Sequence, residues 1–222
     1  MTRTFALPAV LLAAALAGCT TAAHRDERPV VSLEAPPAAN AWQRVAGAED
    51  QARIRRLEEA WAVSLEEARK ANAGAIRAEG DLLKPEAALA RPAPTPGSYN
   101  CRLVRLGSYS AKAPAFEKFK PFFCYVEVEG DLLTIVKQTG SERPAGRLWE
   151  DEGASRLIFL GSMALGSEDQ PLAYGENGRR DMAGVVERIA PFRWRLVIPW
   201  PRAESKLDVF ELTPVAEQPA TS

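Results

Sequence analysis

The sequence predicts a mainly β fold, in which an amphipathic N-terminal helix precedes about eight short antiparallel strands closed into an up-and-down barrel. Apolar residues spaced by three and four run from about Ala48 to Asn72, which is the spacing of one stripe of a helix. After a proline-rich segment the apolar residues alternate instead, as they do in strands. Because local turns join most of these segments, and closure removes the exposed edges of such a sheet, we expect a barrel. A β-sandwich of the same strands is the alternative.

Residues 1–18 have the composition of a secretory signal peptide. Arg3 supplies a positive charge, Phe5 to Ala15 form a short apolar run, and small residues precede Cys19. The run is too short for a spanning helix, which needs about 20 apolar residues. Leu16-Ala17-Gly18-Cys19 resembles a bacterial lipobox, after which cleavage leaves a cysteine that receives acyl chains. We therefore expect Cys19 to be the lipid attachment residue, with an ordinary signal peptide that contains a cysteine as the alternative.

Lipid attachment at Cys19 implies a membrane partner and a location. Acyl chains contribute about 0.8 kcal/mol per buried methylene group, so a multiply acylated cysteine holds a chain to a membrane without a spanning segment. By resemblance to lipoprotein sorting rules, Thr20 rather than an aspartate after the cysteine favours the outer membrane. We expect the chain in the cell envelope, anchored at the periplasmic face of the outer membrane.

Residues 19–47 and 48–90 are expected to be a lipidated tether and an amphipathic helical segment. Prolines interrupt the tether, and it has no sustained apolar period. The apolar stripe of the helical segment comprises Ile54, Leu57, Trp61, Leu65 and Ala68. Gly74 and Gly80 predict an end or a bend, and a short helical turn is expected at Pro85 to Leu89. We expect the stripe to pack against the domain that follows, with a partner-binding helix as the alternative.

Residues 91–98, which contain three prolines, are expected to be a stiff linker, and residues 99–214 the barrel domain, before a polar tail at 215–222. Strand character is found at 99–104, 124–129, 132–138, 147–150, 156–165, 182–189, 192–198 and 207–212. Gly130-Asp131 predicts a two-residue hairpin turn, and a longer turn is expected around Gly140 to Pro144. The segment 156–165 is apolar on both faces, so the helix is expected to cover its outside. In 192–198, apolar residues alternate with Arg193 and Arg195, which predicts a half-buried strand.

Cys101 and Cys124 form an even pair in a chain that is expected to be exported, which predicts a disulfide. Both fall on the apolar faces of their strands, and neighbouring strands bring such positions within reach of each other. In the chain-entropy model the bond would stabilise the fold by roughly 3 kcal/mol. Two buried free thiols are the alternative.

The single histidine, His24, lies in the expected tether. The sequence therefore offers no Ser-His-Asp or Cys-His arrangement and no histidine metal cluster. It also lacks the serine-elbow, S-x-x-K, phosphate-loop and dinucleotide motifs. We expect no catalytic residue, no metal and no cofactor. Hydrolysis by paired carboxylates remains an alternative, because it needs only two acidic residues across a cleft. Its candidates are Glu150, Asp151, Asp181 and Glu187, and each has a simpler structural interpretation.

The densest polar and glycine-rich motif is Thr139 to Gly146. Lys137 and Arg143 are the candidates for binding an anionic group there, at a rim of the barrel, and a structural turn is the alternative. Gly175 to Gly178 hints at a cation loop but lacks the regular acid spacing of a calcium site. Four phenylalanines are placed to line an apolar mouth or to close the barrel end, namely Phe116, Phe119, Phe122 and Phe123.

Three segments together carry a family resemblance. They are Pro96-Gly97-Ser98-Tyr99-Asn100-Cys101-Arg102, Thr139-Gly140-Ser141-Glu142-Arg143-Pro144-Ala145-Gly146, and Arg193-Trp194-Arg195-Leu196-Val197-Ile198-Pro199 with Leu207-Asp208-Val209. In them the chain resembles the alphaproteobacterial envelope proteins with the domain of unknown function DUF4893, over roughly Trp42 to Pro214. The resemblance implies no activity and contributes no catalytic residues. The expected barrel is also similar to calycins in architecture, which implies no ligand.

The charge balance excludes one class of partner. The chain has 28 basic and 29 acidic residues, and loss of residues 1–18 removes only Arg3. A nearly neutral chain without a basic tract gives no reason to expect a nucleic-acid partner. The expected function is a non-enzymatic interaction or envelope-structural module with an envelope protein or the cell wall as partner. The alternatives are a carrier of a small apolar ligand in the barrel interior and a carboxylate-dependent hydrolase. A cavity of about 300 Å³ or more would favour the carrier, and a filled interior would favour the interaction module.

Overall fold

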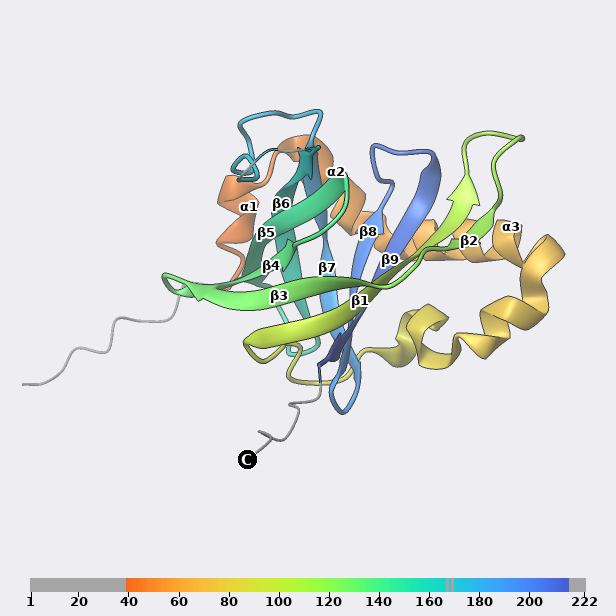
Figure 1. Cartoon of the computed structure of the whole chain (residues 1–222), viewed down its shortest axis with the longest axis horizontal. Coiled ribbons are helices and arrows are strands. Elements are labelled where there is room, and N and C mark those ends of the chain that lie inside the picture. Colours follow the sequence, from red (N-terminus) through yellow and green to blue (C-terminus); the bar gives the residue numbers. More distant parts are fainter. Residues whose placement is uncertain (1–38, 167, 169, 216–222) are drawn as a thin grey trace, which may run out of the picture. The chain divides into compact units, whose positions relative to one another are not determined.

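The computed structural model of the chain describes residues 39–166, 168 and 170–215 (Figure 1). The expected signal peptide, Cys19, His24 and most of the tether lie outside these residues, as does the tail after Val215. The helices are α1 Trp42–Val45, α2 Ala48–Arg55, α3 Leu57–Ala78 and the 3₁₀ turns η1 Gly80–Leu83 and η2 Pro85–Ala87. Within this part of the chain, every helix is too short or too polar to cross a membrane.

The strands form one antiparallel sheet that closes on itself. They are β1 Gly97–Ser108, β2 Phe116–Lys118, β3 Phe122–Glu129, β4 Leu132–Lys137, β5 Glu142–Glu150, β6 Arg156–Leu165, β7 Asp181–Ala190, β8 Arg193–Pro199 and β9 Ser205–Pro214. From β3 to β9 each strand pairs with its neighbours in sequence, and β1 pairs with both β3 and β9. The predicted eight-stranded up-and-down barrel is therefore confirmed over the sandwich, with β1 and β3 to β9 as its wall.

Two strands differ from the sequence prediction. The three-residue strand β2 was not predicted; it pairs with the second half of β1, where Val104 lies opposite Lys118. The turn expected around Gly140 to Pro144 is shorter than predicted, because β5 already begins at Glu142 and Pro144 lies opposite Met163. Proline usually indicates a break in a strand, but Pro144 stands inside a paired strand.

The barrel wall separates two apolar cores. Inward-facing side chains, among them Tyr99, Phe159 and Trp194, fill the inside. The outward-facing residues Ile158 and Leu160 of β6 belong to a second core that the helices share. The expectation that something covers the outside of this doubly apolar strand is thus confirmed.

The helical segment packs against the outside of the barrel as the stripe predicted. All five stripe residues, Ile54, Leu57, Trp61, Leu65 and Ala68, are buried. The chain bends at Asn72, where φ and ψ leave the helical range, and α3 ends before Gly80, which has φ of +59°. The packed part of the chain begins earlier than residue 48, because Trp42 of α1 is only 4% exposed.

The predicted linker lies against the barrel rather than standing away from it. Arg188 of β7 donates hydrogen bonds to the carbonyl of Ala90, and the amide of Arg91 donates to the carbonyl of Ala154 at 3.0 Å. The last residues of the predicted 91–98 segment already form the start of β1. Backbone hydrogen bonds thus fix the path between the helices and the sheet.

Strand β8 is not half-buried as predicted. Its outward residues Arg195 and Val197 are both 0% exposed. The alternation in the sequence correctly separates two faces, but it assigns the arginine face to water. The helical segment covers that face instead.

The disulfide Cys101–Cys124 joins β1 and β3, with a Cα–Cα distance of 6.1 Å. Cys101 lies opposite Phe122 and Cys124 lies opposite Tyr99, so the two cysteines are diagonal neighbours across the strand pair. Both are 2% exposed. The predicted pairing on the apolar faces is confirmed.

A close contact between β5 and β6 requires glycine. Gly146 lies opposite Gly161, and a Cβ on Gly161 would approach the carbonyl oxygen of Ala145 to 2.2 Å and the ring of Phe159 to 2.7 Å. The ring of Phe159 therefore fills the space that two side chains would otherwise occupy. Glycine pairs of this kind allow a barrel wall to curve sharply.

Candidate functional site

The barrel interior has little free space. The pocket that opens beside the disulfide, between Phe122, Phe159 and Phe210, has a volume of about 10 Å³. Ligand pockets usually measure about 300 Å³ or more. Because an apolar carrier would need a cavity of about 300 Å³ or more, the filled interior favours the interaction module over the carrier.

A larger hollow lies on the outer wall. A groove of about 470 Å³ runs over the outward faces of β3 to β6 and is bordered by α1 and by residues 170–174. Its apolar lining includes Val45 of α1, which is 45% exposed, together with Trp149 and Leu160. Glu129 and Arg147 form an exposed ion pair on the same wall, at 2.6 Å. We call this surface the β3–β6 groove.

Tyr174 fixes one border of the β3–β6 groove. Its hydroxyl accepts a hydrogen bond from the amide of Gly47 at 2.9 Å and donates one to the buried carboxylate of Asp50 at 2.6 Å. Asp50 also forms an ion pair with Arg53. Burial raises the pKa of Tyr174 above its usual value, so the hydroxyl keeps its proton and remains a donor.

The predicted rim residues Lys137 and Arg143 both line a hollow of about 320 Å³ at the end of β4 and the start of β5, but their side chains contact different partners. Lys137 ends β4 with its ammonium 4.4 Å from the centre of the Phe122 ring, on the inside. Arg143 faces outward and donates hydrogen bonds to the carbonyls of Gly166 and Glu168. Arg143 therefore holds a loop, and its guanidinium is occupied.

Another hollow of about 210 Å³ lies at the barrel mouth formed by the end of β1 and the start of β9. Five arginines and three acids line it, above an apolar floor that includes Met163, Met182 and Ile198. Arg105 of β1 and Asp208 of β9 lie opposite each other in the sheet register. We call this pocket the Arg105 mouth.

Among the acidic residues that line the Arg105 mouth, Asp208 has the most strongly shifted pKa. Burial raises its pKa to about 6, while a hydrogen bond from the Ser205 hydroxyl and the charge of Arg105 act in the opposite direction. The Ser205 Oγ to Asp208 Oδ1 distance is 2.5 Å. A carboxyl with such a pKa in a cleft is a candidate functional group.

Sequence reasoning missed both Arg105 and Asp208. A signal was present, since Asp208 stands between the buried residues Leu207 and Val209 and on the face that Phe210 shares. A charge at an inward position of an alternating strand is unusual, because a charge without a partner is expensive to bury. Lys137 was predicted, and it lines the small pocket beside the disulfide, where burial lowers its pKa and the charge of Glu142 opposes that effect.

The four candidate acids are dispersed. Glu150 is exposed at the end of β5, while Asp151 accepts hydrogen bonds from the Trp42 indole at 2.9 Å and from Arg156 at 2.6 Å. Glu187 forms a buried ion pair with Arg195 at 2.7 Å. Asp181 alone lines the Arg105 mouth, and its carboxylate accepts a hydrogen bond from the Gly175 amide at 3.1 Å.

The loop at Gly175 to Gly178 is held by its own hydrogen bonds. Asn177 accepts from the amide of Arg179 through its side chain and from the amide of Arg180 through its carbonyl. Among the residues described, no group of three or more His, Cys, Asp or Glu is placed to hold a metal ion. Of the four phenylalanines, Phe119 and Phe122 pack against the inner core, Phe116 packs against the outer one, and Phe123 is exposed.

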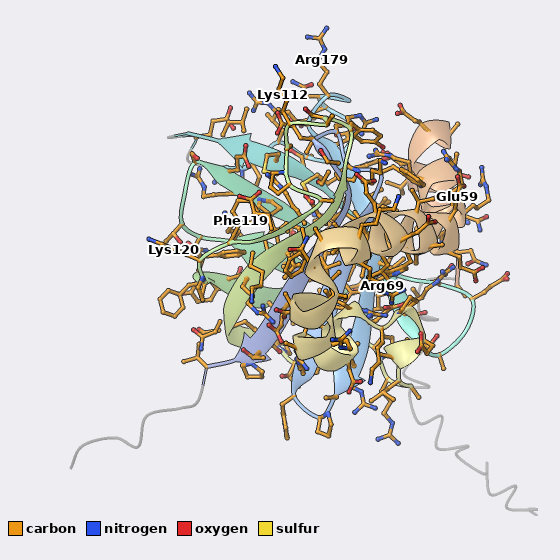
Figure 2. The ribbon with its side chains drawn as sticks, turned by 90° about the vertical axis from the view of Figure 1, so that its right-hand side faces the viewer. Glu59, Arg69, Lys112, Phe119, Lys120 and Arg179 are labelled. Atoms are coloured by element: carbon orange, nitrogen blue, oxygen red, sulfur yellow. A yellow bond between two sulfur atoms is a disulfide. The ribbon has the colours of Figure 1, made fainter. Side chains whose placement is uncertain are left out.

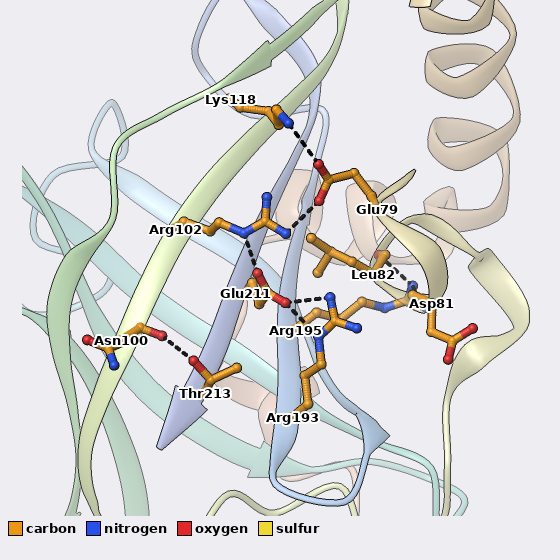
Figure 3. Close-up of polar contacts among 10 residues, drawn as sticks. All are labelled: Glu79, Asp81, Leu82, Asn100, Arg102, Lys118, Arg193, Arg195, Glu211 and Thr213. Atoms are coloured by element: carbon orange, nitrogen blue, oxygen red, sulfur yellow. Dashed lines mark hydrogen bonds and ion pairs between the residues drawn. The ribbon is translucent and has the colours of Figure 1, made fainter. Parts of the chain in front are cut away.

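A network of ion pairs joins the helical segment to the barrel (Figure 3). Arg102 of β1 bonds Glu79 at 2.5 Å and also Glu211 of β9, which pairs in turn with Arg193 of β8. Burial alone would raise the pKa of Glu79, but hydrogen bonds from Arg102 and Lys118 bring it below the usual value. Glu79 is therefore held ionised against the barrel.

Arg195 makes the second connection of this network. Its guanidinium donates hydrogen bonds to the carbonyls of Leu82 at 3.0 Å, Lys84 at 2.7 Å and Pro85 at 2.9 Å, as well as to Glu187. It also lies over the ring of Trp61, 4.9 Å from its centre. These contacts satisfy the carbonyls of the 3₁₀ turns, so Arg195 has a structural role.

The fold defines the class of protein: a closed eight-stranded antiparallel barrel with a helical segment ahead of it in the chain. Its interior is filled, and it has a groove on the outer wall and a charged mouth. Residues 42–212 match the model of the family described as "Domain of unknown function (DUF4893)". The chain belongs to the DUF4893 family. Neither a curated protein nor a solved structure matches the chain in these comparisons.

Proposed function

We propose that the chain is an alphaproteobacterial envelope lipoprotein that acts as a non-enzymatic interaction module. In this proposal Cys19 carries the lipid, the tether after it reaches from the periplasmic face of the outer membrane, and the barrel binds another envelope protein. The cell wall is the second candidate partner. One observation supports the proposal above all: the inner pocket beside the disulfide has a volume of about 10 Å³, whereas the β3–β6 groove on the outer wall has a volume of about 470 Å³.

The β3–β6 groove suits an apolar segment of a protein. The helical segment packs on the outward faces of β1, β7, β8 and β9, whereas the groove leaves Val45 45% exposed at its border. Exposed apolar surface that is contiguous, rather than scattered, is typical of interaction sites. The Glu129–Arg147 pair beside it would set the orientation of the partner.

The docking test uses a photocrosslinking amino acid at Val45, which borders the β3–β6 groove, in the full chain irradiated in intact envelopes. The matched control position is Tyr109, which is 59% exposed in the connection between β1 and β2. We expect one protein adduct of defined mass from position 45 and none from position 109. Val45→Glu should abolish co-purification of that protein, whereas Tyr109→Glu should not. Native mass spectrometry that finds a stoichiometric small molecule and no protein partner would overturn the proposal, and a glycan adduct would reassign the partner to the cell wall.

The anchor has a separate test. Growth with a clickable fatty acid should label the wild-type chain, and Cys19→Ser should lose the label and move the protein from the membrane fraction to the soluble periplasmic fraction. Thr20→Asp should shift the labelled protein toward the inner membrane. An unlabelled wild-type chain in the cytosol would contradict the lipoprotein assignment without bearing on the groove.

A further inference from the structure

The guanidinium of Arg105 lacks a close hydrogen-bond partner in the Arg105 mouth. Its Nε atom lies 3.5 Å from Asp208 Oδ1 and its Nη2 atom lies 3.8 Å from Glu142 Oε2. Both separations exceed the usual N–H to O hydrogen-bond range of about 2.7–3.2 Å. Arg105 Nε is also buried without a hydrogen-bond partner among the described residues. Because a buried N–H without an acceptor is unfavourable, this donor needs an explanation.

Most other arginines around the pocket are already bonded. Arg53 donates to the carbonyl of Trp200 and forms an ion pair with Asp50, while its Nε, like that of Arg105, has no hydrogen-bond partner among the described residues. Arg180 donates to Glu168 at 2.6 Å, and Arg202 donates to the carbonyl of Asp181 at 2.9 Å. Arg179 extends away from the chain into solvent (Figure 2). Arg105 is therefore the cation of this pocket that is placed for a ligand. The ring of Phe119, 4.8 Å from its guanidinium carbon, supports it from one side.

We propose that the Arg105 mouth binds a small organic monoanion, a carboxylate with a short apolar body, whose carboxylate accepts hydrogen bonds from the guanidinium of Arg105. A guanidinium presents a planar fork of donors that matches a carboxylate. The apolar floor, which includes Met163 and Met182, receives the body of the ligand. The volume of about 210 Å³ is below that of pockets for drug-sized ligands, so the body is short.

The acidic residues of the Arg105 mouth select a ligand with a single negative charge over a dianion. Asp208 faces Arg105 from β9, Glu142 approaches it from β5, and Asp181 lines the same pocket from β7. A dianion such as phosphate would meet these carboxylates with twice the repulsion. Glu142 has a side chain that is 60% exposed and a distance of 3.8 Å to Arg105, so the incoming carboxylate displaces it readily.

Binding is coupled to a proton on Asp208. Its pKa of about 6 results from burial, against the Ser205 hydrogen bond and the Arg105 charge, with the charge of Glu142 adding to the rise. Above that pH the ionised Asp208 repels the ligand and competes for Arg105. Below it the neutral carboxyl leaves Arg105 to the ligand, so the affinity rises as the pH falls from about 7.5 to about 5.5, by on the order of tenfold.

The test is calorimetric titration of the full chain in detergent with sodium benzoate, with benzamide and inorganic phosphate as the comparison probes. We expect benzoate to bind, benzamide to bind at least about tenfold more weakly, and phosphate to bind more weakly than benzoate. Arg105→Gln should weaken benzoate binding by about tenfold or more, because charge-assisted hydrogen bonds are lost. The matched control is Arg147→Gln, which removes the same charge from the outer wall and should change the affinity by less than about twofold.

Several results would overturn this assignment. They are equal affinity for benzoate and benzamide, tighter binding of phosphate than of benzoate, no binding of benzoate by the wild-type chain, and wild-type affinity in Arg105→Gln. If Arg105→Gln does not fold, Glu142→Gln decides, since this exposed residue competes with the ligand and its neutralisation should tighten benzoate binding severalfold. Unchanged or weakened binding in Glu142→Gln would refute the proposal. None of these outcomes depends on the β3–β6 groove or on the lipid anchor.

Discussion

Replacing Arg195 with methionine tests the connection between the helical segment and the barrel. Methionine matches the length of the apolar stem but removes every donor of the guanidinium. The change leaves the carboxylate of Glu187, which is 6% exposed, buried without its partner. Removing one partner of a buried ion pair typically costs about 3–5 kcal/mol. The carbonyls of Leu82, Lys84 and Pro85 also lose their donor.

We therefore expect Arg195→Met to lower the free energy of unfolding by about 3–5 kcal/mol, out of the roughly 5–15 kcal/mol typical of a domain. Arg195→Met combined with Glu187→Leu should recover part of this loss, because a buried ion pair replaced by apolar residues is often close to neutral. The recovery is incomplete, since the carbonyls remain without a donor. The coupling energy between the two residues should be about 1–3 kcal/mol.

Urea unfolding of the full chain, followed by tryptophan fluorescence, measures these differences, and hydrogen exchange should show the largest loss of protection in residues 80–87. The control is Arg147→Met, which breaks an exposed ion pair with Glu129 and should change the free energy of unfolding by less than about 1 kcal/mol. A loss below about 1 kcal/mol for Arg195→Met, or strict additivity with Glu187→Leu, would show that the guanidinium does not bind the helical segment to the barrel.

Three further changes probe the barrel. Alanine at both Cys101 and Cys124 should lower the free energy of unfolding by about 3 kcal/mol, and an unchanged urea midpoint would contradict this. Gly161→Ala should lower it by about 3 kcal/mol or more, because the new Cβ meets backbone at 2.2 Å; Gly178→Ala, in open space, should change it by less than about 0.5 kcal/mol. Folded Asp208 keeps, up to about pH 6, a proton that the unfolded chain releases near pH 4, so its contribution to stability falls by about 3 kcal/mol as the pH rises through this window. Asp208→Asn should remove that fall, and matching pH profiles for the two proteins would refute it.

The strand pattern was readable from the sequence because the inside of the barrel imposes a strict period of two. Tyr99, Cys101 and Leu103 all face the inner core, and the alternation that marked them also brought the cysteines together. The strand β2 had no such signal, since three residues beside β1 contribute only Phe116 to a core. Pro144 misled the prediction of β5 because proline in sequence indicates a turn, whereas here it faces the inside of a paired strand.

The candidate site was less predictable because it depends on which residues from distant strands meet. Alternation placed Arg195 on the outer face of β8 but could not show that the 3₁₀ turns cover it. Lys137 and Arg143 are six positions apart in the chain and line one hollow. The sequence could not show that Lys137 contacts the Phe122 ring, whereas Arg143 donates to the carbonyls of Gly166 and Glu168. Arg105 and Asp208 became a pair only when β1 closed the barrel against β9.

Closure of the barrel also explains the role of the three segments that carry the family resemblance. Arg102 and Arg195, which lie in the segments that carried the resemblance, bind Glu79 and the carbonyls of the 3₁₀ turns, so these segments specify how the helical segment joins the barrel. Within the same segments, Glu142, Ile198 and Asp208 line the Arg105 mouth, and Asp208 is the buried charged residue among them. Asp208 neither joins two elements nor fills a core, and burial disfavours its charge. A ligand that binds in the Arg105 mouth beside it explains its position best. Arg105 therefore deserves the first binding experiment, even though the fold could be recognised without it.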